Sequence, residues 1–121
     1  MLAEILLAAM LAWGIGGLQT TVIVEDLPSP RVGQATVATA PRCAIWLDVS
    51  LFEPWAELIV TNVVIHEMGH CLWVPHSTDN SSIMYPVANF GAVLTDADRE
   101  AFRTTRAWFP HHVTTVGLAS D

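Results

Sequence analysis

Three histidines and one glutamate stand close together in the middle of this chain of 121 residues. His66, Glu67 and His70 form the pattern H-E-x-x-H. On a helix, side chains four residues apart leave the same face, so His66 and His70 would offer two imidazole ligands to one metal ion. Glu67 points around the helix toward the same cleft without binding the ion, which is where a general base belongs. The stretch predicts metal-assisted hydrolysis.

A third histidine, His76, follows beyond the expected end of that helix, so the chain must bend back to bring it to the ion. Three neutral imidazoles leave one tetrahedral position open for water, which is typical of catalytic zinc sites and not of closed structural ones. We therefore expect Zn²⁺ as the cofactor, with His66, His70 and His76 as its ligands and Glu67 as the catalytic base.

The residues around this stretch resemble a known family. The pattern H-E-x-x-H-x-x-x-x-x-H is followed by Ser77 and then by "SIMYP", which contains Met84. Together these residues resemble the metzincin metallopeptidases, and most closely the matrixin-like group. The resemblance implies a zinc-dependent endopeptidase whose peptide substrate lies extended across the cleft. It also implies that Met84 packs beneath the zinc in a Met-turn, and that the protein is secreted, although no convincing signal peptide is present.

One residue departs from the family pattern, because Trp73 stands where the family has glycine. The left-handed backbone that glycine adopts there costs another residue about 1–2 kcal/mol. Trp73 could tolerate that cost, or Pro75 could turn the chain in another way. In a third case His76 misses the ion, and the chain is a zinc-binding or peptide-binding module without activity. A different H-E-x-x-H class, with Asp98 or Glu100 as third ligand, is disfavoured by the position of His76.

The elements that must position the site can be read from local patterns. A capping-box spacing of Ser50 and Glu53 predicts an active-site helix from about residue 54 to about residue 72. Thr95 and Asp98 have the spacing of a capping box and predict the start of a last helix. Two β-branched or alternating stretches, 20–26 and 42–50, predict strands. In the second, the residues expected to face the core are Cys43, Ile45, Leu47 and Val49.

The outward residues of the second strand suggest that it lies near a sheet edge, where a peptide substrate could pair with it near residues 43–49. The fold class expected is α+β, a minimal metzincin-like domain over residues 1–121. In it a small twisted sheet packs on an N-terminal helix and the active-site helix, followed by a Met-turn and a C-terminal helix. Residues 111–121 are expected to be a tail.

The first 18 residues are apolar and allow more than one interpretation. Leu2, Ile5 and Trp13 share one helical face with Leu6 and Ala9, which favours a helix of the core. A secretory signal or a membrane anchor remains an alternative. The only early charge is the negative Glu4, and the run is shorter than the roughly 20 apolar residues that span a membrane. Membrane association is therefore not expected.

The amino-acid composition limits the classes of molecule that the protein is expected to bind. The formal net charge is −7, and the five cationic residues are all arginine, so the basic stripe that binds nucleic acid is not expected. A peptide or protein substrate is the expected partner, and the sequence does not indicate an oligomeric state. Cys43 and Cys71 could form one bridge or stay as two buried thiols, of which the second is favoured because free cysteine is commonly buried.

Overall fold

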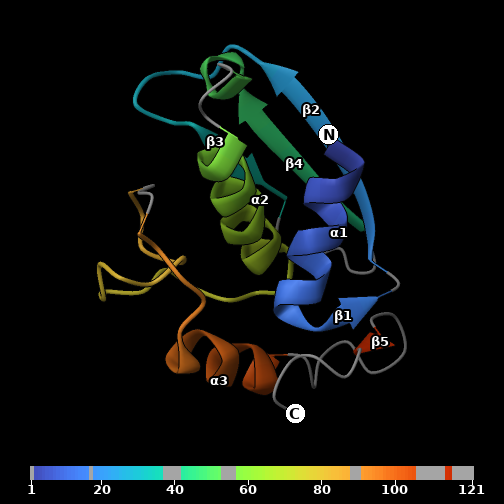
Figure 1. Ribbon diagram of the computed structural model, residues 1–121, viewed down its shortest axis with the longest axis vertical. Helices are drawn as coiled ribbons and strands as arrows, with labels where there is room; N and C mark the ends of the chain where they lie inside the picture. Colours follow the sequence, from blue (N-terminus) through green and yellow to red (C-terminus); the bar gives the residue numbers. More distant parts are fainter. Residues whose placement is uncertain are drawn as a thin grey trace.

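The computed structural model describes residues 2–16, 18–36, 42–52, 57–87, 91–105 and 114–115. It has the expected α+β architecture, with three helices and a three-stranded mixed sheet (Figure 1). The helices are α1 (Leu2–Trp13), α2 (Glu57–Cys71) and α3 (Asp96–Thr105), with a short 3-10 helix η1 (Val49–Phe52). The sheet contains β2 (Gln19–Glu25), β3 (Gly33–Ala35) and β4 (Arg42–Asp48).

Strand β4 is the centre of the sheet and not its edge. The strand order is β2-β4-β3, with β2 parallel and β3 antiparallel to β4. The prediction that a peptide pairs with residues 43–49 is therefore wrong, because both sides of β4 are already hydrogen-bonded to neighbours. Its inward residues Cys43, Ile45 and Leu47 are buried as predicted. Val49 lies beyond the last strand residue and is 51% exposed, so the predicted alternation stops before it.

Helices α1 and α2 pack against each other on one face of the sheet (Figure 1). Ile5, Ala9 and Trp13 of α1 are buried and Glu4 is exposed, in agreement with the predicted core face. The indole Nε1 of Trp13 donates a hydrogen bond of 2.9 Å to the carbonyl oxygen of Ile65 in α2. Nowhere in the described segments is there a helix long and apolar enough to cross a membrane.

The active-site helix is described from Glu57 to Cys71, and its predicted start near residue 54 lies outside the described residues. Ser50 belongs to the turn after β4, because its backbone N–H and its hydroxyl both donate to the carboxylate of Asp48. The other oxygen of Asp48 accepts a hydrogen bond of 2.8 Å from the backbone N–H of Leu27. Ser50 is therefore part of η1. Glu53, the other half of the expected capping box, lies outside the described residues.

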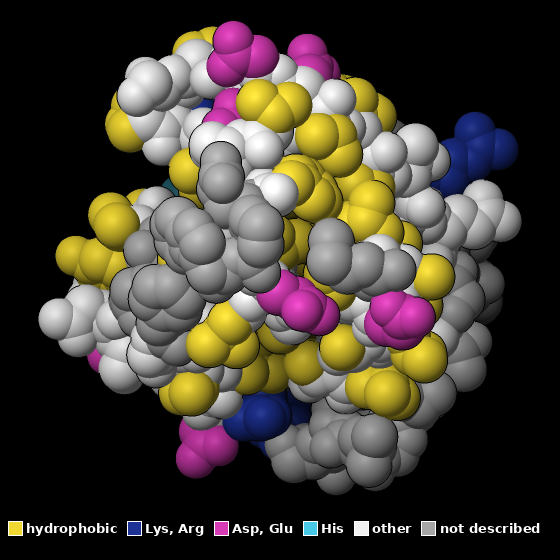
Figure 2. Space-filling model, turned by 45° about the horizontal axis from the view of Figure 1, so that its top comes forward, with side chains coloured by type: hydrophobic (Ala, Val, Ile, Leu, Met, Phe, Trp, Pro, Cys, Tyr) yellow, Lys and Arg dark blue, Asp and Glu magenta, His cyan; other side chains and the backbone are white. Residues whose placement is uncertain are grey.

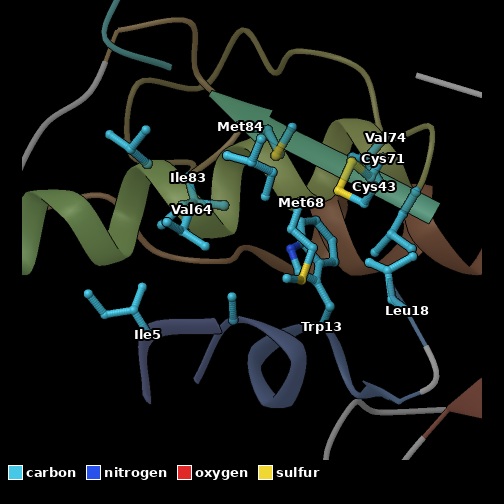
Figure 3. Packing of buried hydrophobic residues seen from close by; sticks show 14 of the residues in the cluster. Ile5, Trp13, Leu18, Cys43, Val64, Met68, Cys71, Val74, Ile83 and Met84 are labelled. Atoms are coloured by element: carbon cyan, nitrogen blue, oxygen red, sulfur yellow. A yellow bond between two sulfur atoms is a disulfide. The ribbon is translucent and has the colours of Figure 1, made fainter. Parts of the chain in front are cut away.

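A disulfide joins Cys43 of β4 to Cys71, the last residue of α2. The prediction of two buried thiols is wrong. The two cysteines are 28 residues apart in the chain, and their Cα atoms lie 5.6 Å apart in the fold. Figure 3 shows the bridge beside Val74, in the layer between the sheet and the active-site helix. The bridge fixes the C-terminal end of α2 to the central strand.

Two further strands join distant parts of the chain. Strand β1 (Ile15–Gly16) pairs with β5 (Thr114–Thr115) in an antiparallel ladder. The expected tail over residues 111–121 therefore contains a paired segment, and its other residues lie outside the described part. On the face shown in Figure 2, acidic side chains lie among hydrophobic ones, and the arginine side chains drawn there lie in isolated places.

Candidate active site

The first two histidines of the site lie on the same face of α2, as their spacing predicts. The Nε2 atoms of His66 and His70 are 3.1 Å apart. The Nδ1 atom of His66 lies 2.7 Å from the carbonyl oxygen of Ile83, and that of His70 lies 3.0 Å from the carbonyl oxygen of Val74. A carbonyl oxygen only accepts, so Nδ1 carries the proton in both rings. The lone pair of each Nε2 is then directed toward a common point.

Trp73 adopts the backbone conformation that glycine takes at this position in the family, with φ of 66°. The N–H of Val74 donates to the carbonyl of Gly69, and the N–H of Trp73 donates to that of His70. These two bonds form a Schellman motif, the usual way to end a helix with one left-handed residue. Helix α1 ends in a similar way at Gly14, with φ of 72°. Trp73 therefore does not prevent the chain from turning back.

The turn after Trp73 brings His76 to the other two histidines. Its Nε2 atom lies 3.1 Å from Nε2 of His70, and one ring nitrogen from each of the three residues falls within 4.8 Å of the others. Zinc–nitrogen bonds of about 2.0–2.1 Å in a tetrahedron separate the nitrogens by about 3.3 Å, so these distances fit such an ion. The three histidines are positioned to bind a metal, which argues against the alternative in which His76 misses the ion.

The carboxylates considered as alternative third ligands have other partners. Asp98 is buried and accepts a hydrogen bond of 2.6 Å from the hydroxyl of Ser82. Glu100 is exposed and forms an ion pair of 2.6 Å with Arg103 on the surface of α3. Among the residues that the structure describes, the group able to hold a metal is made of histidines alone.

Glu67 lies buried beside this group, with its Oε2 atom 4.0 Å from Nε2 of His66. Burial raises the pKa of Glu67 to about 7, although the positive charge of Arg31 acts in the opposite direction. Burial likewise lowers the pKa of His66 to about 4 and shifts the pKa of His70 downward. The two imidazoles are therefore neutral near pH 7, the form that binds metal, while Glu67 is poised to exchange a proton.

Glycine at position 33 is a site residue that the sequence analysis missed. Strand β3 passes so close to α2 that a Cβ atom on Gly33 would lie 2.7 Å from Cγ1 of Val63 and 2.8 Å from Oε2 of Glu67. Real Cβ atoms do not approach other atoms so closely. The absence of a side chain at Gly33 therefore allows the sheet edge to lie directly against the general base candidate. The sequence analysis predicts no strand at 33–35, so no local pattern marks Gly33 as a site residue.

Met84 is fully buried and lies against α2 (Figure 3). It meets the helix at Gly69, where a Cβ atom would lie 2.7 Å from the sulfur of Met84 and 2.7 Å from the indole of Trp13. The backbone N–H of Met84 donates to the hydroxyl of Ser82, which in turn donates to Asp98. These buried bonds connect the start of α3 to the turn that carries Met84.

The histidines open onto a cleft with a volume of about 820 Å³. One wall is β3 with the residues before it, 30–35, and the other is the segment 83–87 with Ala92. The floor is the face of α2 that carries Asn62, Val63, His66, Glu67 and His70. A cleft with an edge strand on one side and a metal group at its floor can hold an extended chain against the reacting groups.

Comparison with known proteins agrees with this geometry. The family model Peptidase M10, described as matrixin, matches residues 37–105, which is more than half of the chain. The match contains the three histidines, Glu67 and Met84, and it ends with the last residue of α3. No curated protein matches the chain.

Proposed function

Because the chain belongs to the matrixin family, we propose that it is a zinc-dependent endopeptidase that cleaves peptide bonds with Glu67 as the general base. The observation that carries the proposal is the convergence of His66, His70 and His76 on one point beside the buried carboxylate of Glu67. The family supports zinc as the metal. When bound, zinc supplies a water acidified to a pKa of about 7 and polarises the substrate carbonyl.

The three histidines would hold the ion through Nε2, because the Nδ1 atoms of two of them are engaged by the carbonyls of Ile83 and Val74. Those carbonyls fix the orientation and the tautomer of the rings before the metal arrives. Met84 would be the family's Met-turn residue, packed under the ligands and not among them. The fixed rings mean that little reorganisation accompanies metal binding.

Glu67 would accept the proton of the attacking water and pass it to the leaving amine. A base works best when its pKa lies near the working pH, and burial places the pKa of Glu67 at about 7. Opposite charge lowers the pKa of a carboxyl group, so a bound metal would move this value downward. Glu67 would then be fully ionised near pH 7 and ready to accept the first proton.

The substrate would lie along β3, whose outer side is the edge of the sheet that faces the cleft. An extended peptide adds to such an edge through backbone hydrogen bonds. This places the substrate one strand away from the position predicted from the sequence.

The disulfide between Cys43 and Cys71 supports a location in an oxidising compartment, such as outside the cell.

Zinc content and peptidase activity, measured together, test the proposal. The parent chain and Glu67→Gln are purified, zinc per chain is measured, and both are incubated with a mixed peptide library. We expect about one zinc per chain in both proteins and cleavage by the parent alone. A parent that binds zinc and cleaves nothing would instead be a metzincin-like binding module, and a parent that binds no zinc would contradict the whole assignment.

A further inference from the structure

The cleft contains a single cation among the lining residues that the structure describes. This is Arg31, and the only acid in the same lining is Glu67. The backbone N–H of Arg31 donates a hydrogen bond of 2.9 Å to the carbonyl of Pro28, which fixes the residue in a turn just before β3. Arg31 also precedes residue 37, where the family match begins. Arg31 therefore lies outside the residues that the family model matches.

The guanidinium of Arg31 keeps most of its hydrogen-bonding capacity. The residue is exposed, and Nη1 donates one hydrogen bond of 2.8 Å to Oε1 of Gln34. Within the described segments it forms no salt bridge with a carboxylate. A guanidinium has five N–H donors in a planar fork that matches a carboxylate. The side chain can therefore receive an anionic group from a bound molecule.

Arg31 lies at a distance from Glu67 and the cleaved bond that suits a residue that selects substrates. Gly33 lies against Glu67, so a peptide bond under attack would lie beside Gly33. Arg31 is two residues earlier, so its Cα lies at most about 7 Å from that of Gly33. The long side chain can reach a group two to four residues from the cleaved bond, and only on one side of it. The net charge of −7 makes the rest of the protein a poor attractor for such a group.

We propose that Arg31 is a specificity residue, which selects peptides carrying a carboxylate on its side of the cleaved bond. The carboxylate belongs either to an aspartate or glutamate side chain or to the C-terminus of a short peptide. This inference rests on the proposed function, because it uses the same cleft and the same edge strand. Arg31 acts by binding the substrate and takes no part in proton transfer.

The test compares matched peptides that differ by one charge. A neutral peptide that the parent cleaves is resynthesised with Glu or Gln at each position two to four residues from the cleaved bond, on both sides. A second pair has a free or an amidated C-terminus. We expect kcat/KM to favour Glu over Gln by about 3- to 10-fold at positions on one side only. A preference confined to the free C-terminus identifies the chain end as the carboxylate source.

Four variants assign the preference to Arg31. Arg31→Gln should abolish it while cleavage of the neutral peptide persists, and Arg31→Lys should retain part of it. Arg31→Glu should reverse it, so that Lys is favoured over Glu at the same position, a result that misfolding cannot produce. Arg103→Gln removes one positive charge from the exposed face of α3 and should leave the preference unchanged.

Two results would overturn the inference. The first is an equal ratio of Glu to Gln peptides in the parent and in Arg31→Gln, with the neutral peptide still cleaved. The second is a binding result, used if the parent cleaves no peptide; that lack of cleavage contradicts the proposed function but does not by itself test Arg31. Labelled peptides with a single Glu or Gln are then bound to the zinc-loaded Glu67→Gln chain, and equal affinity with and without the further change Arg31→Gln contradicts the role of Arg31.

Discussion

The backbone of Gly33 lies against the carboxylate of Glu67, so closely that one added methyl group would come within 2.8 Å of Oε2. The contact joins the edge strand, where a substrate would bind, to the group that would accept a proton. Neither partner is a ligand of the metal. The relative position of substrate and base therefore depends on a glycine that lies outside the H-E-x-x-H motif.

We expect Gly33→Ala to lower kcat/KM by about 10- to 100-fold, because the strand or the carboxylate must move by a fraction of an ångström to make room. Zinc content should not change, since Gly33 is remote in sequence from the histidines and the atoms nearest to an added Cβ belong to Val63 and Glu67. Steady-state kinetics and metal analysis check both points. Gly91→Ala, at an exposed glycine, is the matched control. Full activity of Gly33→Ala would show that the contact has no role in positioning.

Trp73 holds a left-handed backbone conformation that glycine adopts without strain. We expect Trp73→Gly to raise the free energy of unfolding by about 1 kcal/mol and to leave zinc affinity unchanged. Urea unfolding of both proteins measures the first effect and competition with a chelator measures the second. Trp73→Ala keeps a Cβ atom, so it should show no such gain. A loss of stability in Trp73→Gly would mean that contacts of the indole outweigh the backbone strain.

The disulfide fixes the end of α2, next to His70. We expect its removal in the double variant Cys43→Ser/Cys71→Ser to lower the free energy of unfolding by about 3.5 kcal/mol, as for a closed loop of this size. Zinc affinity should fall as well, because the last turn of the helix carries a ligand. Denaturant titration and chelator competition measure the two effects. Reductant should reproduce both losses in the parent and change nothing in the double variant, and equal stability of all samples would contradict the role.

The metal-free protein should show a pH dependence in which two kinds of group oppose each other. The pKa of His66 is lowered from its ordinary value of 6.5 to about 4 in the fold, so its contribution to stability is present above pH 6.5 and is lost as pH falls toward 4. The pKa of His70 shifts in the same direction. The pKa of Glu67 is raised from 4.5 to about 7, so its unfavourable contribution at neutral pH disappears as pH falls from 7 toward 4.5.

Because these windows overlap, the metal-free parent should lose only a modest part of its stability between pH 7 and pH 4. Glu67→Gln removes the compensating group. We therefore expect this variant to exceed the parent in stability by up to about 3 kcal/mol at pH 8 and to decline more steeply on acidification. Urea unfolding of chelator-treated protein across this range provides the comparison. Parallel curves for parent and variant would show that Glu67 is not held in a buried environment.

The sequence revealed the parts of the site that lie on one helix or close after it. His66, Glu67 and His70 could be placed on one side of the helix because their spacing alone determines it. His76 was predicted as the third ligand because it follows shortly after the end of that helix. The strand 42–48 was recognised, but alternation shows which side chains face the core and not which strands flank it. Three features could not be predicted in this way: the central position of this strand, the disulfide between Cys43 and Cys71, and the contact of Gly33 with Glu67. Each depends on contacts between segments distant in sequence, which local patterns do not indicate.

The two walls of the cleft come from separate parts of the fold and meet only across α2. One is the edge of the sheet, residues 30–35, and the other is the segment 83–87. The second is held by hydrogen bonds from Met84 to Ser82 and from Ser82 to Asp98. Neither wall supplies a metal ligand. Substitutions of cleft-facing side chains in either wall would therefore change what fits the cleft while all three histidines stay in place, so that substrate preference can diverge one wall at a time.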